Sequence, residues 1–329
     1  MKIATNCWWP VVESRELAHR PLPVRRFGRN LVLWRDSAGM PHALPDRCPH
    51  LGAALSAGRV SGDRLVCPFH GFEFDGDGQC RHIPAVGRDG RIPKGMAVAG
   101  LAVREAHGLL YLWQGAPRET YPPLPFFAPL DESWRWGSVR VDWPVHYTRA
   151  IENQLDVAHL PFVHRTTIGA AGLTRVEGPH VESEGDELRV WTTNARDDGG
   201  PRRDAEALAA AARTRPPTLR FLFPNLWLLD LSPRLKNVIA FAPIDERTTR
   251  YYLRVYHRHR SPLIARPFEF VMGLSNRYIL NQDRRVVITQ TPAESGEADD
   301  RLIGADRAIA LFRRELRRRL AEAEAPVSD

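Results

Sequence analysis

The chain has 329 residues, of which 26% are charged and 43% hydrophobic, and its formal net charge is +7. This length predicts about two domains of ordinary globular composition. The sequence has no run of about 18 apolar residues, so we do not expect a membrane span. Its arginines are scattered rather than gathered into a stripe with aromatic residues, which argues against a nucleic-acid binder.

The first residues, MKIATNCWWPVV, have neither the basic start nor the long apolar run of a secretory signal, and they carry no lipidation signal. Four cysteines are too few for a disulfide scaffold in a chain of this length. In a reducing compartment, paired cysteines more often bind a metal. We therefore expect a cytoplasmic protein in which some of the cysteines are metal ligands.

The N-terminal part, residues 1–115, consists of short alternating runs separated by Gly, Pro and Asp turns, which predicts a small all-β domain. A proline-rich stretch over 116–130 is expected to be a linker. Residues 131–329 combine a helix near 148–160 with several strand-like runs, which predicts an α+β domain.

The same domain is expected to end in a helix, because apolar residues recur there at helical spacing: Ile309, Phe312, Leu316 and Leu320. An insertion rich in Gly, Ala and Arg over 196–217 is expected to be a surface loop, with a mobile lid as the alternative.

Two short segments of the first domain each combine one cysteine with one histidine. RCPHLGAAL contains Cys48 and His50, and VCPFHGFEF contains Cys67 and His70. Two thiolates and two imidazoles can hold a tetrahedral zinc or divide between the irons of a 2Fe–2S cluster. Zinc fingers usually pair Cys with Cys and His with His, whereas each segment here offers one of each between predicted strands, which favours the cluster.

The remaining cysteines, Cys7 and Cys80, lie outside this pattern, and we expect them to be small buried residues.

The second domain contains a segment with two histidines and a carboxylate, IENQLDVAHLPFVHR. Asp156 and His159 are three residues apart, so on a helix they would share one face. Pro161 disfavours helix at Leu160, and a turn there would bring His164 back towards His159. Two imidazoles beside a carboxylate suggest a 2-His-1-carboxylate iron site, although two satisfied core histidines are the alternative for such a pair taken alone.

Together these motifs resemble the Rieske non-haem iron oxygenases. CPH…CPFHG is similar to the Rieske signature, and Asn153, Asp156, His159 and His164 are similar to the family's Asn-x-x-Asp-x-x-His-x-x-x-x-His segment. The resemblance implies that Cys48, His50, Cys67 and His70 bind the 2Fe–2S cluster and that His159 and His164 bind mononuclear Fe(II). It also implies that Asp156 bridges the two metal centres without binding iron.

The resemblance further implies a third iron ligand far downstream. LNQDRRVVITQTP fits the family's pattern, which makes Asp283 the candidate, with Gln282 and Gln290 completing the match. Asp299 and Asp300 are weaker candidates because they lie in a polar stretch that is typical of an exposed loop.

The implied fold is an N-terminal all-β Rieske domain followed by an α+β helix-grip (START-like) domain. The implied function is that of a terminal oxygenase, which hydroxylates or oxidatively demethylates a small organic substrate with dioxygen. The resemblance points to the short homotrimeric branch of the family and to a separate ferredoxin or flavin reductase as electron donor. No dinucleotide-binding fingerprint is present, so electrons from NAD(P)H have to come through such a partner. The alternative is a Rieske electron carrier without oxygenase activity, against which the presence of both His159 and His164 argues.

The sequence does not identify the substrate. Alternation places four apolar residues on one strand face, where they either line a substrate cavity or belong to the core: Phe221, Phe223, Trp227 and Leu229.

Overall fold

The computed structural model describes residues 1–201 and 203–324. The chain forms two compact units, one over Ile3–Leu124 and one that begins at Pro125. This division falls inside 116–130, the predicted linker, all of which is described and contains neither helix nor strand. The limits 1–115 and 131–329 remain predictions of where the domains end.

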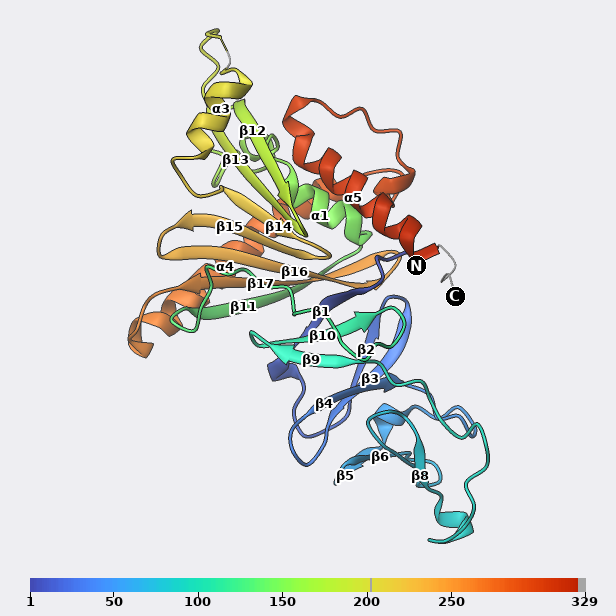
Figure 1. Cartoon of the computed structure of the whole chain (residues 1–329). Coiled ribbons are helices and arrows are strands. Elements are labelled where there is room, and N and C mark those ends of the chain that lie inside the picture. The colour runs from blue at the N-terminus through green and yellow to red at the C-terminus, as the bar shows by residue number, and fades with distance from the viewer. Residues whose placement is uncertain (202, 325–329) are drawn as a thin grey trace. The chain divides into compact units, whose positions relative to one another are not determined.

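The first unit is built from short antiparallel strands in three sheets, in the orders β1-β10-β9, β2-β3-β4 and β5-β6-β7-β8 (Figure 1). Its strands are β1 (Cys7–Glu13), β2 (Leu22–Arg26), β3 (Arg29–Arg35), β4 (Pro41–Pro45), β5 (Arg59–Ser61), β6 (Arg64–Val66), β7 (Glu73–Phe74), β8 (Cys80–His82), β9 (Val103–Ala106) and β10 (Leu109–Gln114). One core cluster packs Trp34, Phe72 and Phe74 around Cys48 and Cys67. The two cysteine loops therefore start from inside the core.

The second unit is a seven-stranded antiparallel sheet in the order β11-β17-β16-β15-β14-β13-β12. Its strands are β11 (Arg135–Trp143), β12 (Arg175–Glu184), β13 (Glu187–Ala195), β14 (Leu219–Leu222), β15 (Leu226–Ser232), β16 (Leu235–Asp245) and β17 (Thr248–His257). Its helices are α1 (Tyr147–Leu155), α2 (Leu160–Val163), α3 (Ala205–Ala212), α4 (Pro262–Val287) and α5 (Arg307–Glu324). None of the helices among the described residues is both long and apolar enough to cross a membrane.

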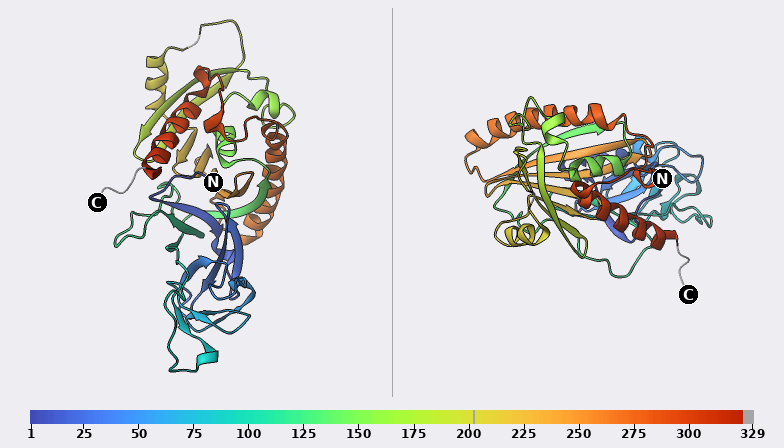
Figure 2. Two further views of the ribbon diagram at one scale, coloured as in Figure 1. Left: turned by 90° about the vertical axis from the view of Figure 1, so that its right-hand side faces the viewer. Right: turned by 90° about the horizontal axis from the view of Figure 1, so that it is seen from above.

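Helices α4 and α5 cover the same face of this sheet. Phe221 lies opposite Trp227, and Trp227 lies opposite Ile239, so these side chains share a face with Asn237, two residues before Ile239. On that face Phe221 contacts Phe312 of α5, and Asn237 pairs with a side chain of α4. Figure 2 shows α1 between α4 and α5. The predicted C-terminal helix and the α+β class are confirmed.

Three local expectations differ from the structure. Helix α1 ends at Leu155, and Asp156 is already extended (φ −69°, ψ 125°), so Asp156 and His159 do not share a helical face. Leu160 is helical, because it opens α2 and Pro161 stands in the first turn of that helix, where a missing N–H costs nothing. The insertion over 196–217 also differs from a plain loop, since it includes α3, which Asp204 caps by accepting a hydrogen bond from Ala207 N at 2.7 Å.

Candidate metal centres

The two cysteine loops of the first unit have the same backbone pattern. Cys48 N donates to Ala53 O at 2.8 Å and Gly52 N donates to Cys48 O at 2.9 Å. Cys67 N donates to Phe72 O at 2.8 Å, and Gly71 N donates to Cys67 O at 3.1 Å. Gly52 and Gly71 both close their loop at positive φ, +76° and +71°, a conformation that favours glycine. Each loop thus turns one cysteine inwards and sends one histidine out.

The loops separate the ligands by type. Cys48 and Cys67 are buried, whereas His50 and His70 are exposed with ring centroids 4.8 Å apart. Burial and the neighbouring Cys67 thiol raise the pKa of Cys48 to about 11, while the backbone N–H groups of His50 and Leu51 favour its thiolate. Paired thiols on one side and paired imidazoles on the other fit a cluster with two cysteines on one iron and two histidines on the other.

The other two cysteines do not join this arrangement. Cys80 is buried, as expected, and burial raises its pKa, whereas Cys7 is partly exposed.

In the second unit, three predicted iron ligands come together, although Asp283 is far in sequence from the two histidines. His159 precedes α2, His164 follows it, and Asp283 lies on the buried face of α4. Asp283 Oδ1 lies 2.9 Å from His164 Nε2 and 3.4 Å from His159 Nε2, and the three ligand atoms all lie within 4.8 Å of one another. Ligands about 2.1 Å from one metal and at right angles would be roughly 3 Å apart, so the spacing fits a facial triad.

Polar atoms at this site lack hydrogen-bond partners among the described residues. Asp283 is 3% exposed, and its Oδ1 forms no hydrogen bond with any of the described residues despite its short distance from His164. A buried carboxylate oxygen without a donor is costly unless something else compensates its charge. A bound cation would do so, and the histidine nitrogens that face the same point are suitable co-ligands.

Each histidine faces a side-chain oxygen at Nδ1, and only that of His164 is within hydrogen-bond distance. His159 Nδ1 lies 3.6 Å from Asp156 Oδ2, and Asp156 Oδ1 accepts a hydrogen bond from Ala158 N at 2.7 Å. Burial raises the pKa of Asp156, but the contacts with His159 and Ala158 N outweigh it and lower the pKa overall. His164 Nδ1 lies 2.9 Å from Gln282 Oε1. Burial lowers the pKa of His164, but the close contacts of its ring with Asp283 and Gln282 outweigh this effect, so the net shift is upwards.

The two alternative candidates for the third ligand, Asp299 and Asp300, are not part of this triad. Asp300 pairs with Arg149 at 2.7 Å and with Arg313 at 2.6 Å, and Asp299 is exposed. Gln290 is also exposed, beyond the end of α4. The geometry therefore favours Asp283 as the third ligand.

Tyr251 is a residue of this region that the sequence did not single out. It is fully buried on β17, and its hydroxyl has no partner among the described residues. Burial and the negative charge of Asp283 raise its pKa well above the usual value, so it remains a neutral O–H donor near the triad. Alternation along the strand indicates that the side chain is buried, but not which group it faces.

Of the four candidate substrate-wall residues, Phe221, Phe223 and Trp227 are buried and Leu229 is partly exposed. Phe221 and Phe223 contact Phe312 of α5 at ring-centroid distances of 5.3 and 5.7 Å, which makes them core residues. Trp227 is also buried, and its indole N–H has no partner among the described residues.

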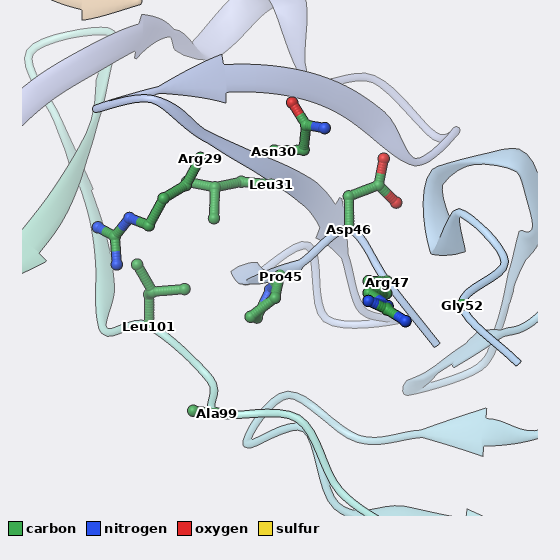
Figure 3. A pocket seen from close by; sticks show the side chains of 9 residues that line it. All are labelled: Arg29, Asn30, Leu31, Pro45, Asp46, Arg47, Gly52, Ala99 and Leu101. Atoms are coloured by element: carbon green, nitrogen blue, oxygen red, sulfur yellow. The ribbon is translucent and has the colours of Figure 1, made fainter. Parts of the chain in front are cut away.

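A pocket of about 660 Å³ lies on the first unit, beside the Cys48 loop (Figure 3). Arg29, Asp46, Arg47 and Gly52 are among its lining residues, and none of the proposed metal ligands is. Its two arginines are exposed and place positive charge next to a ligand loop.

Comparisons with known proteins match both parts of the chain. A family model described as the Rieske [2Fe-2S] domain matches residues 7–102, and one described as the vanillate O-demethylase oxygenase C-terminal domain matches residues 143–322. Chlorophyllide a oxygenase of Chlamydomonas reinhardtii is 37% identical over 165 residues, which are 49% of this chain and 25% of the relative. The oxygenase component of dicamba O-demethylase from Stenotrophomonas maltophilia is 33% identical over 190 residues, 56% of this chain and 55% of the relative.

Among solved structures, dicamba monooxygenase bound to 3,6-dichlorosalicylic acid superimposes with a TM-score of 0.78 at 22% identity, over 99% of this chain and 100% of that one. NdmA of Pseudomonas putida CBB5, as a QL mutant with caffeine, gives 0.77 at 24% identity, over 97% and 92%. These likenesses confirm the predicted fold class. Because the C-terminal model matches more than half of the chain and a Rieske [2Fe-2S] domain precedes it, the chain belongs to the vanillate O-demethylase oxygenase family of Rieske oxygenase components.

Proposed function

We propose that this chain is the terminal oxygenase of a multicomponent system that hydroxylates or oxidatively demethylates a small organic substrate. The juxtaposition of His159, His164 and Asp283 supports this function over that of an electron carrier, which needs no second metal site. Bound iron would supply reductive activation of dioxygen, and the Rieske cluster would supply single electrons.

The side chains have separate tasks in this proposal. The imidazoles of His159 and His164 offer Nε2 to the metal, and Asp283 contributes the negative charge that holds a divalent cation. Asp156 faces His159 Nδ1 and orients that ring from behind. An iron held by these three residues would keep coordination positions open for oxygen, water or substrate.

We further propose that the oxygenase is a cytoplasmic homotrimer that receives electrons from a ferredoxin or a flavin reductase. Apolar side chains stand exposed beside the metal ligands of both units: Leu51 (64%) and Phe69 (60%) beside His50 and His70, and Phe162 (66%) between His159 and His164. Head-to-tail contacts in a cyclic trimer would bury both groups. Arg29 and Arg47, exposed beside the Cys48 loop, would attract an acidic electron donor.

Metal analysis of the purified protein tests the class of function. We expect about three irons per chain, two in the cluster and one in the triad, together with a brown colour and a reduced-state paramagnetic signal of a Cys2His2 cluster. Cys48→Ser should remove the colour. A fully coloured Cys48→Ser protein would refute the cluster assignment, and two irons with no oxygen uptake would identify an electron carrier.

The substrate class requires a turnover assay. NADH-dependent oxygen uptake with a reductase should be followed for a panel of methoxyarenes, steroids and amines. Product formation that matches oxygen uptake would identify the substrate class. Oxygen uptake that gives only hydrogen peroxide or water, without oxidised product, would exclude that compound.

A further inference from the structure

Gln282, next to the proposed ligand Asp283, reaches from α4 to the turn that follows α2. Its Oε1 lies 2.9 Å from His164 Nδ1 and accepts a hydrogen bond from Thr167 Oγ1, also at 2.9 Å. Its Nε2 donates to Thr166 Oγ1 at 3.2 Å. Both ends of the amide are thus held, and the oxygen end faces the histidine.

The orientation of this amide has a chemical consequence for His164. A histidine that binds a metal through Nε2 must carry its proton on Nδ1, and that N–H needs an acceptor. Gln282 Oε1 is such an acceptor. If the amide were flipped, its NH2 group would face the N–H of Nδ1, and two donors would oppose each other. Thr167 reinforces the arrangement, because its hydroxyl also donates to the oxygen.

The two histidines differ in the charge behind them. His159 has the carboxylate of Asp156 at Nδ1, whereas His164 has the neutral amide of Gln282. With Asp283 and Asp156 as the two nearby anions, a divalent cation would already be balanced. A neutral acceptor at His164 therefore orients the ring without adding further negative charge.

We propose that Gln282 is the positioning residue of His164: it fixes the Nδ1–H tautomer and turns Nε2 towards Asp283, and Thr166 and Thr167 hold it in place. This inference rests on the proposed iron site. It adds a residue that lies behind a proposed ligand and on which metal affinity would depend.

Cobalt binding measures this role without turnover. The mononuclear metal is removed with a chelator, the cluster is retained, and the protein is dialysed against graded Co(II), with cobalt per chain measured by mass spectrometry. Gln282→Leu should bind Co(II) about 10–100-fold more weakly, the usual cost of losing such a partner. Gln282→Glu keeps an acceptor oxygen and should recover most of this loss. Gln290→Leu, an exposed glutamine beyond α4, is the matched control and should bind as wild type.

A second pair of variants tests the support of the amide. Thr167→Val removes the hydroxyl that donates to Gln282 and should weaken Co(II) binding severalfold, whereas Thr167→Ser should not. If Gln282→Leu bound like wild type, or if Gln282→Glu were as weak as Gln282→Leu, the positioning role would be overturned. Asp283→Ala distinguishes a failure of the Gln282 proposal from a failure of the proposed iron site. If Asp283→Ala binds Co(II) weakly and Gln282→Leu binds it normally, only the role of Gln282 is refuted. If Asp283→Ala binds Co(II) normally, the iron site itself is refuted.

Discussion

Asp283 is the residue on which the proposed iron site depends most, because it is the anionic ligand beside two neutral imidazoles. Its position could not be derived from local spacing, since it lies 119 positions after His164. Only the resemblance of the surrounding segment to a known family pointed to it. The proposed cluster ligands differ in this respect, because each pair of one Cys and one His lies within one short loop, so that their spacing alone pointed to a metal site.

Replacement of Asp283 by alanine should empty the triad while leaving the cluster intact. Loss of a partner behind a ligand costs about 10–100-fold in metal affinity, so loss of the ligand itself should cost at least about 100-fold. The expected protein is brown, has about two irons per chain and does not turn over, as judged by metal analysis and oxygen uptake.

Asp299→Ala provides the control, because Asp299 is exposed and outside the triad. If Asp299→Ala lost iron and Asp283→Ala kept it, the third ligand would have to be reassigned.

At the scale of elements, periodicity identified the C-terminal helix and the strands of the large sheet, but it misplaced the helix break near the histidines. Pro161 was taken as a stop signal, whereas it stands in the first turn of α2, and the chain leaves α1 at Asp156. A proline is compatible with both roles, and only the packing around it decides. Phe221 and Phe223 show the same difficulty. Alternation predicts which face of the strand they occupy, but it does not predict that helix α5 covers that face.

Helix α5 is tied to α1 by a buried group of charges. Arg313 donates to both oxygens of Glu152, at 2.6 and 2.9 Å, and also to Asp300, which in turn accepts from Arg149. Arg149, Glu152 and Arg313 are all less than a tenth exposed. The sequence does not predict this buried group of charges, because Arg313 is one of many arginines on an amphipathic helix.

Arg313→Met should destabilise the second unit by about 3 kcal/mol, because it leaves the Glu152 carboxylate buried with one partner fewer. The measurement is the urea concentration at half-unfolding, followed by tryptophan fluorescence. Arg318→Met removes an exposed arginine of the same helix and should leave this midpoint unchanged. Equal midpoints for the two variants would contradict a structural role of the buried group.

At the scale of the whole molecule, the question is which cluster serves which iron. The two centres belong to separate units of the chain, joined through a stretch without helix or strand. Exposed apolar side chains flank both sets of ligands, which suggests that each centre meets a partner surface. In a cyclic trimer, a repeated head-to-tail contact would place one subunit's cluster beside the next subunit's iron, with Asp156 between a histidine of each.

Mixed trimers test this arrangement directly. A chain with Cys67→Ser lacks the cluster and a chain with His164→Ala lacks the iron site, so each should be inactive alone. When the two are co-expressed in equal amounts, a working cluster faces a working iron at about a quarter of the interfaces of a cyclic trimer. Recovery of about a quarter of the wild-type rate is therefore expected, whereas separately purified trimers mixed without exchange should stay inactive. No recovery in verified mixed trimers would mean that electrons pass within a single chain. Each variant chain lacks either its cluster or its iron site, so transfer within one chain could not restore activity.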